Sequence, residues 1–155
     1  MTSHIRRFLA VTVLIAGIAA GLGLRVALAD AATPQLIQPA ELVKLLQSAK
    51  GQKPLIIQVG FRKLYDQAHI PGAEYVGPAS SDSGRQQLRD RVAKLPRSTP
   101  IILYCGCCPW SHCPNVNPAY SELVGMKFSN VKVLYIADNF GADWVEKGYP
   151  IEKRN

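Results

Sequence analysis

The chain has 155 residues, and its 18 Lys and Arg against 11 Asp and Glu give a formal net charge of +7. This length suits one domain of ordinary size. The basic residues are scattered and are not interleaved with aromatic side chains, so the charge gives no support to nucleic-acid binding.

The first 29 residues have the pattern of a secretory signal peptide. A short basic start, MTSHIRR, precedes the uncharged apolar run FLAVTVLIAGIAAGLGL, which Arg25 closes. The triplet ALA that ends at Ala29 has the small-x-small form of a signal-peptidase site, which predicts cleavage after that residue. The alternative is an uncleaved membrane anchor, although the run is short for a span and contains three glycines. The adjacent Arg6 and Arg7 are compatible with twin-arginine export, so the export route stays open.

Cleavage would leave a mature domain, residues 30–155, in the periplasm or outside the cell, with no membrane contact. The loss of three arginines lowers the Lys and Arg from 18 to 15, against 11 acidic residues, so the formal charge becomes +4. Such compartments are oxidising. Thiols there must be protected, paired, ligated or actively reduced.

The first half of the mature chain alternates between helix and strand patterns. After a small, polar stretch, apolar residues at helical spacing predict a helix that starts at Pro39 and stops at Gly51. The next elements are a buried strand, a turn with a short strand, an amphipathic helix and a second buried strand, over residues 54–60, 69–77, 83–96 and 100–105.

The second half continues this alternation after a cysteine-rich segment. A helix is expected over residues 117–128, with Asn117 as its cap and Pro118 at its first position. A strand over 130–136 and a last helix over 138–150 follow. This order predicts an α/β fold in three layers, with a parallel sheet covered by helices on both faces.

All four cysteines lie in the segment CGCCPWSHC, from Cys105 to Cys113, directly after the second buried strand. In open α/β sheets the ligand site lies beyond the C-terminal ends of the strands. A following helix presents free N–H groups and a dipole that favours negative charge there. A thiol in such a place has a lowered pKa and reacts as a thiolate, so position alone makes Cys105 a candidate nucleophile.

Four segments resemble the rhodanese-like domain family, namely LIIQVGFRKLYDQAHIPGAEYV, LPRSTPIILYC, KFSNVKVLY and ADWVEKGYPIE. They occur in the family's order and lie within roughly residues 35–152. The resemblance implies a small parallel α/β sheet and sulfurtransferase activity without a cofactor. Cys105, at the family's active position, would take a sulfane sulfur from a small donor and become a persulfide. It would then pass the sulfur to a nucleophilic acceptor or to a thiol of a partner protein.

The resemblance also assigns an anion-holding cradle to the loop, formed by Gly106, Pro109, Trp110 and Ser111. Gly106 would permit the unusual dihedral angles of such a loop. Family members usually begin the first motif with aspartate and close it with arginine, but Gln58 and Gly60 occupy those places here. The loop is longer than usual and no Lys or Arg follows until Lys127. An anionic donor such as thiosulfate would therefore meet only backbone dipoles and His112.

The remaining thiols leave several roles open. Cys108 forms a Cys-x-x-Cys pair with Cys105, the pattern of a redox dithiol. Cys113 could resolve an intermediate, or it could form a static disulfide with Cys107 or Cys108. A bond between the adjacent Cys107 and Cys108 would be strained.

A copper(I) or zinc site is the alternative from a different class, and its ligands would come from Cys105, Cys107, Cys108, His112 and Cys113. Structural zinc sites usually take ligand pairs from two separated segments, whereas all of these lie in one tight loop, so no metal is expected. No Cys-x-x-Cys-His is present, which argues against covalent haem. Outside the loop, His69 is expected to be a structural turn residue, and Trp144 and Tyr149 to belong to the core.

Overall fold

The computed structural model describes residues 33–48 and 51–154. The expected signal peptide and its cleavage site lie outside these residues. Among the described residues, no helix combines the length and the apolar character that crossing a membrane requires.

Five parallel strands form one sheet in the order β1-β5-β4-β2-β3. Their bounds are β1 (Gln35–Ile37), β2 (Leu55–Gln58), β3 (Glu74–Tyr75), β4 (Ile101–Tyr104) and β5 (Val131–Leu134). The three buried strands expected from the apolar runs are β2, β4 and β5. The prediction of a parallel sheet is confirmed.

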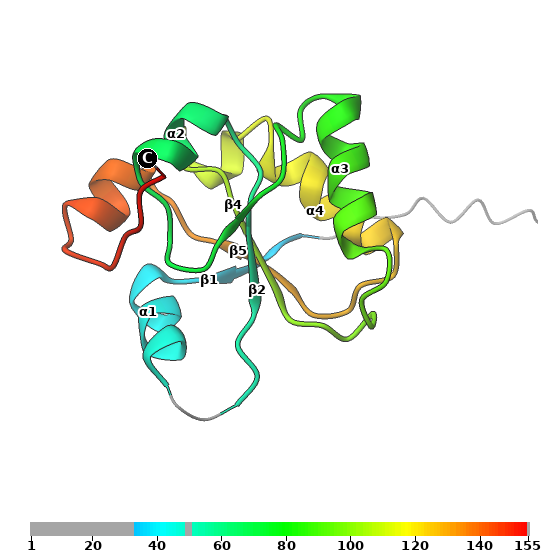
Figure 1. Cartoon of the computed structure of the whole chain (residues 1–155), viewed down its shortest axis with the longest axis horizontal. Coiled ribbons are helices and arrows are strands. Elements are labelled where there is room, and N and C mark those ends of the chain that lie inside the picture. The colour runs from blue at the N-terminus through cyan, green and yellow to red at the C-terminus, as the bar shows by residue number, and fades with distance from the viewer. Residues whose placement is uncertain (1–32, 49–50, 155) are drawn as a thin grey trace, which may run out of the picture.

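Helices cover both faces of the sheet, which confirms the three-layer architecture. One face carries α1 (Pro39–Gln47), α2 (Arg62–Gln67) and the short π-helix η2 (Gly141–Val145). The other carries α3 (Asp82–Val92) and α4 (Val116–Gly125), which lie side by side, with the 3-10 turn η1 (Trp110–His112) just before α4 (Figure 1).

Two hydrophobic cores lie on the two faces, and β4 contributes to both. Ile101 and Leu103 point into the core under α3 and α4, whereas Ile102 and Tyr104 point into the core under α1 and η2. This alternation is the period-two geometry of a strand. Trp144 is fully buried in the second core, as expected, and its indole N–H donates to a backbone carbonyl.

His69 has the structural role expected of it. Its ring stacks on Tyr65 at a centroid distance of 3.8 Å, and its Nδ1 lies 2.8 Å from the Tyr65 carbonyl oxygen. Its backbone forms an antiparallel bridge with Glu152 near the C-terminus. The HIPGA turn is thereby fixed to the end of the domain.

Four local expectations differ from the structure. The last helix, expected over residues 138–150, is only the five-residue π-helix η2. The strand β1 and the helix α2 were not predicted, because three and six residues are too few to show a hydrophobic period. The helix α4 begins at Val116, so its N-cap residue is Asn115 and not Asn117. Asn115 makes no side-chain capping bond, and its amide serves the cysteine site instead.

Candidate functional site

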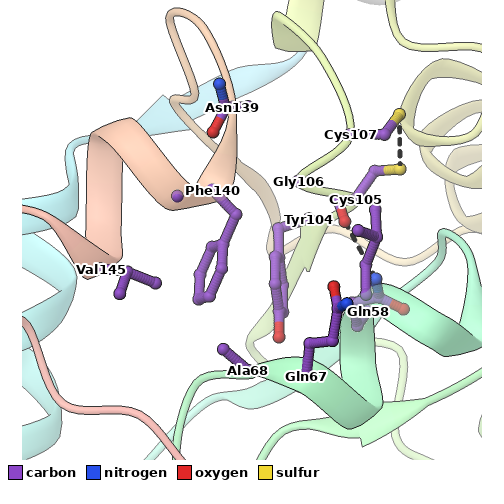
Figure 2. Close-up of a pocket in the computed structure, with 12 residues that line it drawn as sticks. Gln58, Gln67, Ala68, Tyr104, Cys105, Gly106, Cys107, Asn139, Phe140 and Val145 are labelled. Atoms are coloured by element: carbon purple, nitrogen blue, oxygen red, sulfur yellow. Dashed lines mark hydrogen bonds between the residues drawn. The ribbon is translucent and has the colours of Figure 1, made fainter.

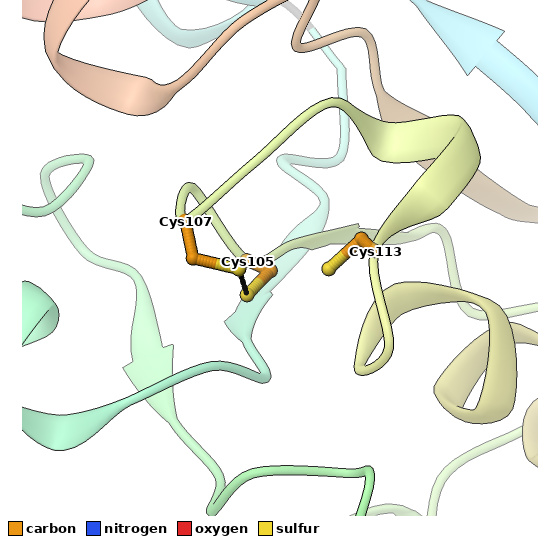
Figure 3. A group of neighbouring side chains, drawn as sticks. All are labelled: Cys105, Cys107 and Cys113. Carbon is orange, nitrogen blue, oxygen red and sulfur yellow. Dashed lines mark hydrogen bonds between the residues drawn. The ribbon is translucent and has the colours of Figure 1, made fainter.

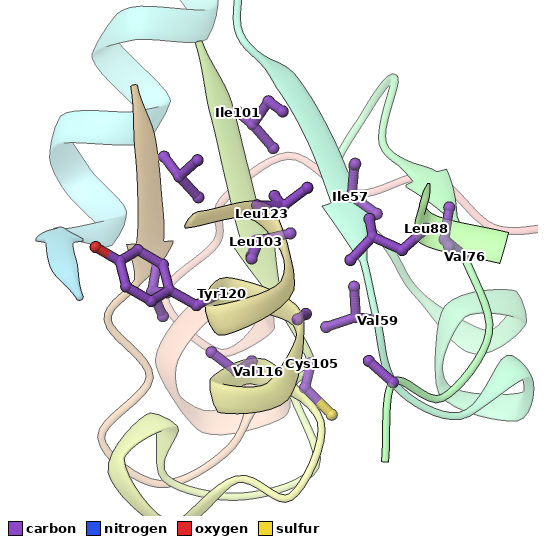
Figure 4. Close-up of a cluster of buried hydrophobic side chains, with 14 of the residues drawn as sticks. Ile57, Val59, Val76, Leu88, Ile101, Leu103, Cys105, Val116, Tyr120 and Leu123 are labelled. Atoms are coloured by element: carbon purple, nitrogen blue, oxygen red, sulfur yellow. The ribbon is translucent and has the colours of Figure 1, made fainter. Parts of the chain in front are cut away.

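Cys105 directly follows β4 and continues its alternation, so its side chain lies on the same face as Leu103. It is only 2 % exposed and belongs to the core under α3 and α4 (Figure 4). Its sulfur therefore lies beneath the first turn of α4 and away from open solvent.

Gln58 and Gly60, the two departures from the family's first motif, both position Cys105. The Gln58 side chain donates from Nε2 to the Cys105 carbonyl oxygen at 2.9 Å and accepts from the Gly60 N–H at 3.3 Å. An ionised carboxylate could not donate this first bond. A Cβ placed on Gly60 would lie 2.5 Å from Cys105 Sγ, so the absence of a side chain there makes room for the sulfur.

Gly106 turns the chain out of β4 with a φ of 86°, which confirms the expected unusual dihedral angle. Its carbonyl oxygen accepts the Phe140 N–H at 3.0 Å, and a Cβ on it would lie 2.7 Å from Phe140 Cβ. Glycine is thus required at this position both by its backbone conformation and by the close approach of Phe140.

The expected cradle of Pro109, Trp110 and Ser111 is not formed. Proline has no N–H, and the Trp110 N–H donates to the Ile136 carbonyl oxygen at 2.9 Å. The Ser111 side chain is exposed and bonds with Nδ1 of His112. These residues instead form the 3-10 turn that carries the chain back towards the sheet.

The turn brings the cysteines together. The Sγ atoms of Cys105, Cys107 and Cys113 all lie within 4.8 Å of one another, although no disulfide joins them (Figure 3). Cys107 Sγ lies 3.3 Å from Cys105 Sγ and 3.0 Å from Cys108 Sγ. The three-thiol group could hold one thiophilic ion, but His112, an expected ligand, is not part of it.

The amides at the start of α4 serve Cys113, where we expected them to serve Cys105. Hydrogen bonding with Cys105, followed by the backbone N–H groups of Val116 and Asn115, lowers the pKa of the Cys113 thiol. Hydrogen bonding with Cys113 and then burial raise the pKa of Cys105, and the Cys107 N–H lowers it by a smaller amount. These opposite shifts favour ionisation of Cys113 over that of Cys105, and the N–H groups at the start of α4 contribute to this preference.

Two more groups complete the surroundings of the sulfurs. The Nδ2 of Asn115 donates to Cys105 Sγ at 3.5 Å, while its Oδ1 accepts from the Ser80 N–H at 3.0 Å. Burial raises the pKa of Cys108 to about 12, which keeps that thiol protonated.

A pocket of about 550 Å³ opens beside Cys105 at the C-terminal ends of β2 and β4, where the sheet was expected to place a ligand site. None of its lining residues carries a charge. Figure 2 shows Phe140 and Val145 on one side and, on the other, Gln67 at the end of α2 and Ala68 just after it. These walls were missed from the sequence, because α2 was not recognised and η2 is distant in the chain.

Comparisons with known proteins agree with this architecture. A family model for the rhodanese-like domain matches residues 38–135. A search of curated proteins finds no match. Among solved structures, the Alr3790 protein from Anabaena sp. is 23% identical with a TM-score of 0.58, over 76% of this chain and 92% of that one.

Two other solved structures have the same fold at lower identity. The polysulfide-sulfur transferase homodimer from Wolinella succinogenes is 15% identical with a TM-score of 0.57, over 79% of this chain and 80% of that one. The BH2092 protein from Bacillus halodurans is 20% identical with a TM-score of 0.56, over 77% of each chain. Likeness at these identities shows the fold alone. The family match, in contrast, spans well over half of the sequence, and the protein therefore belongs to the rhodanese-like domain family.

Proposed function

We propose that this protein is a sulfurtransferase that carries sulfane sulfur as a persulfide on Cys105. Family membership supports sulfur transfer, and one protein with the same fold is a polysulfide-sulfur transferase. The observation that carries the proposal is the position of Cys105. It follows the central strand, is one of the residues that line the pocket, and lies beside a second thiol that can take its proton.

Loading begins with proton transfer. Cys105 is protonated at rest, since its pKa is raised, and the adjacent Cys113 thiolate is the acceptor for its proton. The Cys105 sulfur then attacks the sulfane sulfur of the donor, and the donor's leaving group departs with the electron pair. The Cys107 N–H and the Asn115 amide stabilise the anionic sulfur during this step.

The pocket bears on the class of donor. Its lining consists of amide, aromatic and aliphatic side chains together with the thiols, so an anionic donor such as thiosulfate finds no cationic partner there. The same lining suits a small uncharged donor or the persulfide of a partner protein's thiol. The acceptor would be a nucleophile that reaches Cys105 through the same opening.

The test is cyanide-labile sulfur on the full chain. The reduced protein is incubated with a sulfane-sulfur donor, freed of excess donor and treated with cyanide, and the thiocyanate formed is measured. We expect Cys105→Ser to abolish the signal and Ser129→Ala, an exposed change before β5 at the other end of the sheet, to preserve it. A Cys105→Ser variant that still accepts one sulfur would refute the assignment.

We also propose that the mature protein is exported. The basic start, the apolar run and the small-residue site before Asp30 support this proposal. N-terminal sequencing of protein recovered from the periplasmic or extracellular fraction should begin at Asp30. An intact N-terminus in the cytosolic fraction would contradict it.

A further inference from the structure

Cys113 is a second sulfur that the proposed loading step leaves unmodified. It is 2 % exposed, as is Cys105, and the Sγ atoms of the two residues lie within 4.8 Å of each other. It belongs to the same core cluster as Cys105, on the face covered by α4. Cys105 and Cys107 are among the residues that line the open pocket, and Cys113 is not.

The surroundings of Cys113 stabilise a thiolate. The backbone N–H groups of Asn115 and Val116, at the start of the ten-residue helix α4, lower the pKa of Cys113, as do the Cys105 and Cys108 thiols. The thiolate is the nucleophilic form of cysteine. A sulfur nucleophile thus lies within 4.8 Å of the atom that would carry the persulfide and outside the lining of the pocket.

We propose that Cys113 resolves the Cys105 persulfide, so that the protein releases the transferred sulfur as sulfide. The Cys113 sulfur attacks the inner sulfur of the persulfide and forms the Cys105–Cys113 disulfide, while the proton that Cys113 took from Cys105 during loading passes to the outer sulfur. The bond between the two persulfide sulfurs breaks, and the outer sulfur leaves as hydrosulfide with the electron pair. The two cysteines are oxidised and the sulfane sulfur is reduced to sulfide. This step rests on the proposed loading of Cys105.

Turnover then requires two electrons from outside the protein. An external dithiol, whether a small molecule or a partner protein, would reduce the disulfide by thiol–disulfide exchange. It would attack the Cys105 sulfur, the member of the pair that lines the open pocket. The structure thus assigns the protein a persulfide-reducing activity that consumes a dithiol.

Cys107 Sγ lies nearest to Cys105 Sγ, at 3.3 Å, but the length of the loop that each disulfide would close favours Cys113. A disulfide from Cys105 to Cys113 closes the whole nine-residue segment, whereas one from Cys105 to Cys107 would span a single intervening residue and strain the turn at Gly106. Cys108 belongs to neither the three-thiol group nor the lining of the pocket. The 3-10 turn at Trp110–His112 is the feature that returns Cys113 to Cys105.

A single-turnover experiment on the full chain tests this proposal. The fully reduced protein is loaded without oxygen, freed of donor and left without acceptor, while sulfide release and intact mass are followed. We expect the wild type to release one sulfide per loaded chain and to finish with a Cys105–Cys113 disulfide in the peptide map. The variants Cys113→Ser and Cys113→Ala also lack the acceptor for the Cys105 proton, so they should load more slowly and are given longer incubation with the donor. The sulfur that they do load should stay in cyanide-labile form, without sulfide release.

The outcomes separate the two proposals. Sulfur that stays on Cys105 in the wild type, or sulfide release that continues in both Cys113 variants, overturns the resolving role and leaves sulfur transfer standing. A disulfide that maps to Cys107, with release lost in Cys107→Ser, also overturns it. Failure of every form to load sulfur would refute the proposed function itself. The circular dichroism spectrum of each Cys113 variant shows whether it folds. If one variant misfolds, the other still gives the result.

Discussion

The substitution Gly60→Ala tests the packing that positions Cys105. A Cβ at this position would lie 2.5 Å from Cys105 Sγ and 3.1 Å from the Cys105 carbonyl oxygen. Non-bonded heavy atoms pack best at about 3.5–4.0 Å, so the sulfur would have to move by roughly 1 Å. The backbone of Gly60 is outside the left-handed region, so the effect is steric and not conformational.

The expected cost follows from overpacking a closed core. Extra methyl groups in a well-packed interior lower the free energy of unfolding by about 1–3 kcal/mol, and we expect the loss for Gly60→Ala to fall in this range. The matched control is Gly125→Ala at the end of α4, where a Cβ would meet nothing within 4 Å. Removing a helical glycine should stabilise the protein by up to about 1 kcal/mol.

Equilibrium urea unfolding under reducing conditions measures the free energy of unfolding of both variants. If the slope of this free energy against urea concentration is unchanged, only the stability has changed. The decisive comparison repeats Gly60→Ala in a Cys105→Ala background, which removes the sulfur that the new methyl group would strike. The cost should then fall by about 0.5 kcal/mol or more, the usual size of coupling between contacting residues. The same cost in both backgrounds would refute the packing argument.

Three further predictions concern the loop, the core and the thiolate. Gly106→Ala should destabilise by at least about 2 kcal/mol in urea unfolding, because it combines a φ of 86° with a clash at Phe140, and a neutral result would contradict this. Leu123→Ala, at a fully buried position of α4, should lower the free energy of unfolding by about 2–5 kcal/mol in the same assay. A loss below about 1 kcal/mol would show that the core around Leu123 is loosely packed. Since the folded pKa of Cys113 lies below its ordinary value, its thiolate should persist as the pH falls through the range in which a free thiol becomes protonated. The ultraviolet absorbance of that thiolate should disappear in Cys113→Ser, and identical titrations of the two proteins would contradict the assignment.

The long elements of the fold were predictable because hydrophobic periodicity is a local property. The runs at 54–60, 100–105 and 130–136 contain β2, β4 and β5, and their β-branched, apolar residues indicate burial on both faces. In contrast, β1 and α2 have too few residues to show a period. These two elements are defined by tertiary contacts, since β1 pairs with β5 in the sheet and α2 contributes to the wall of the pocket.

The candidate site was predictable in part. Parallel sheets place ligand sites at their C-terminal ends, which identified the loop after β4, and strand alternation places Cys105 on the face of Leu103. The walls of the pocket were not predictable. Gln67 and Phe140 come from α2 and from the residue before η2, and neither lies near the loop in the sequence.

The sequence by itself determined the order of strands and helices, the parallel sheet and the position of four thiols at its C-terminal end. Only the tertiary structure decided which sulfur receives the amides of α4. That choice depends on the 3-10 turn at Trp110–His112, which folds the loop back and brings Cys113 beneath the first turn of the helix. The pKa of a thiol is set by donors within a few ångströms of its sulfur, and such distances follow from the path of the loop and not from spacing along the chain.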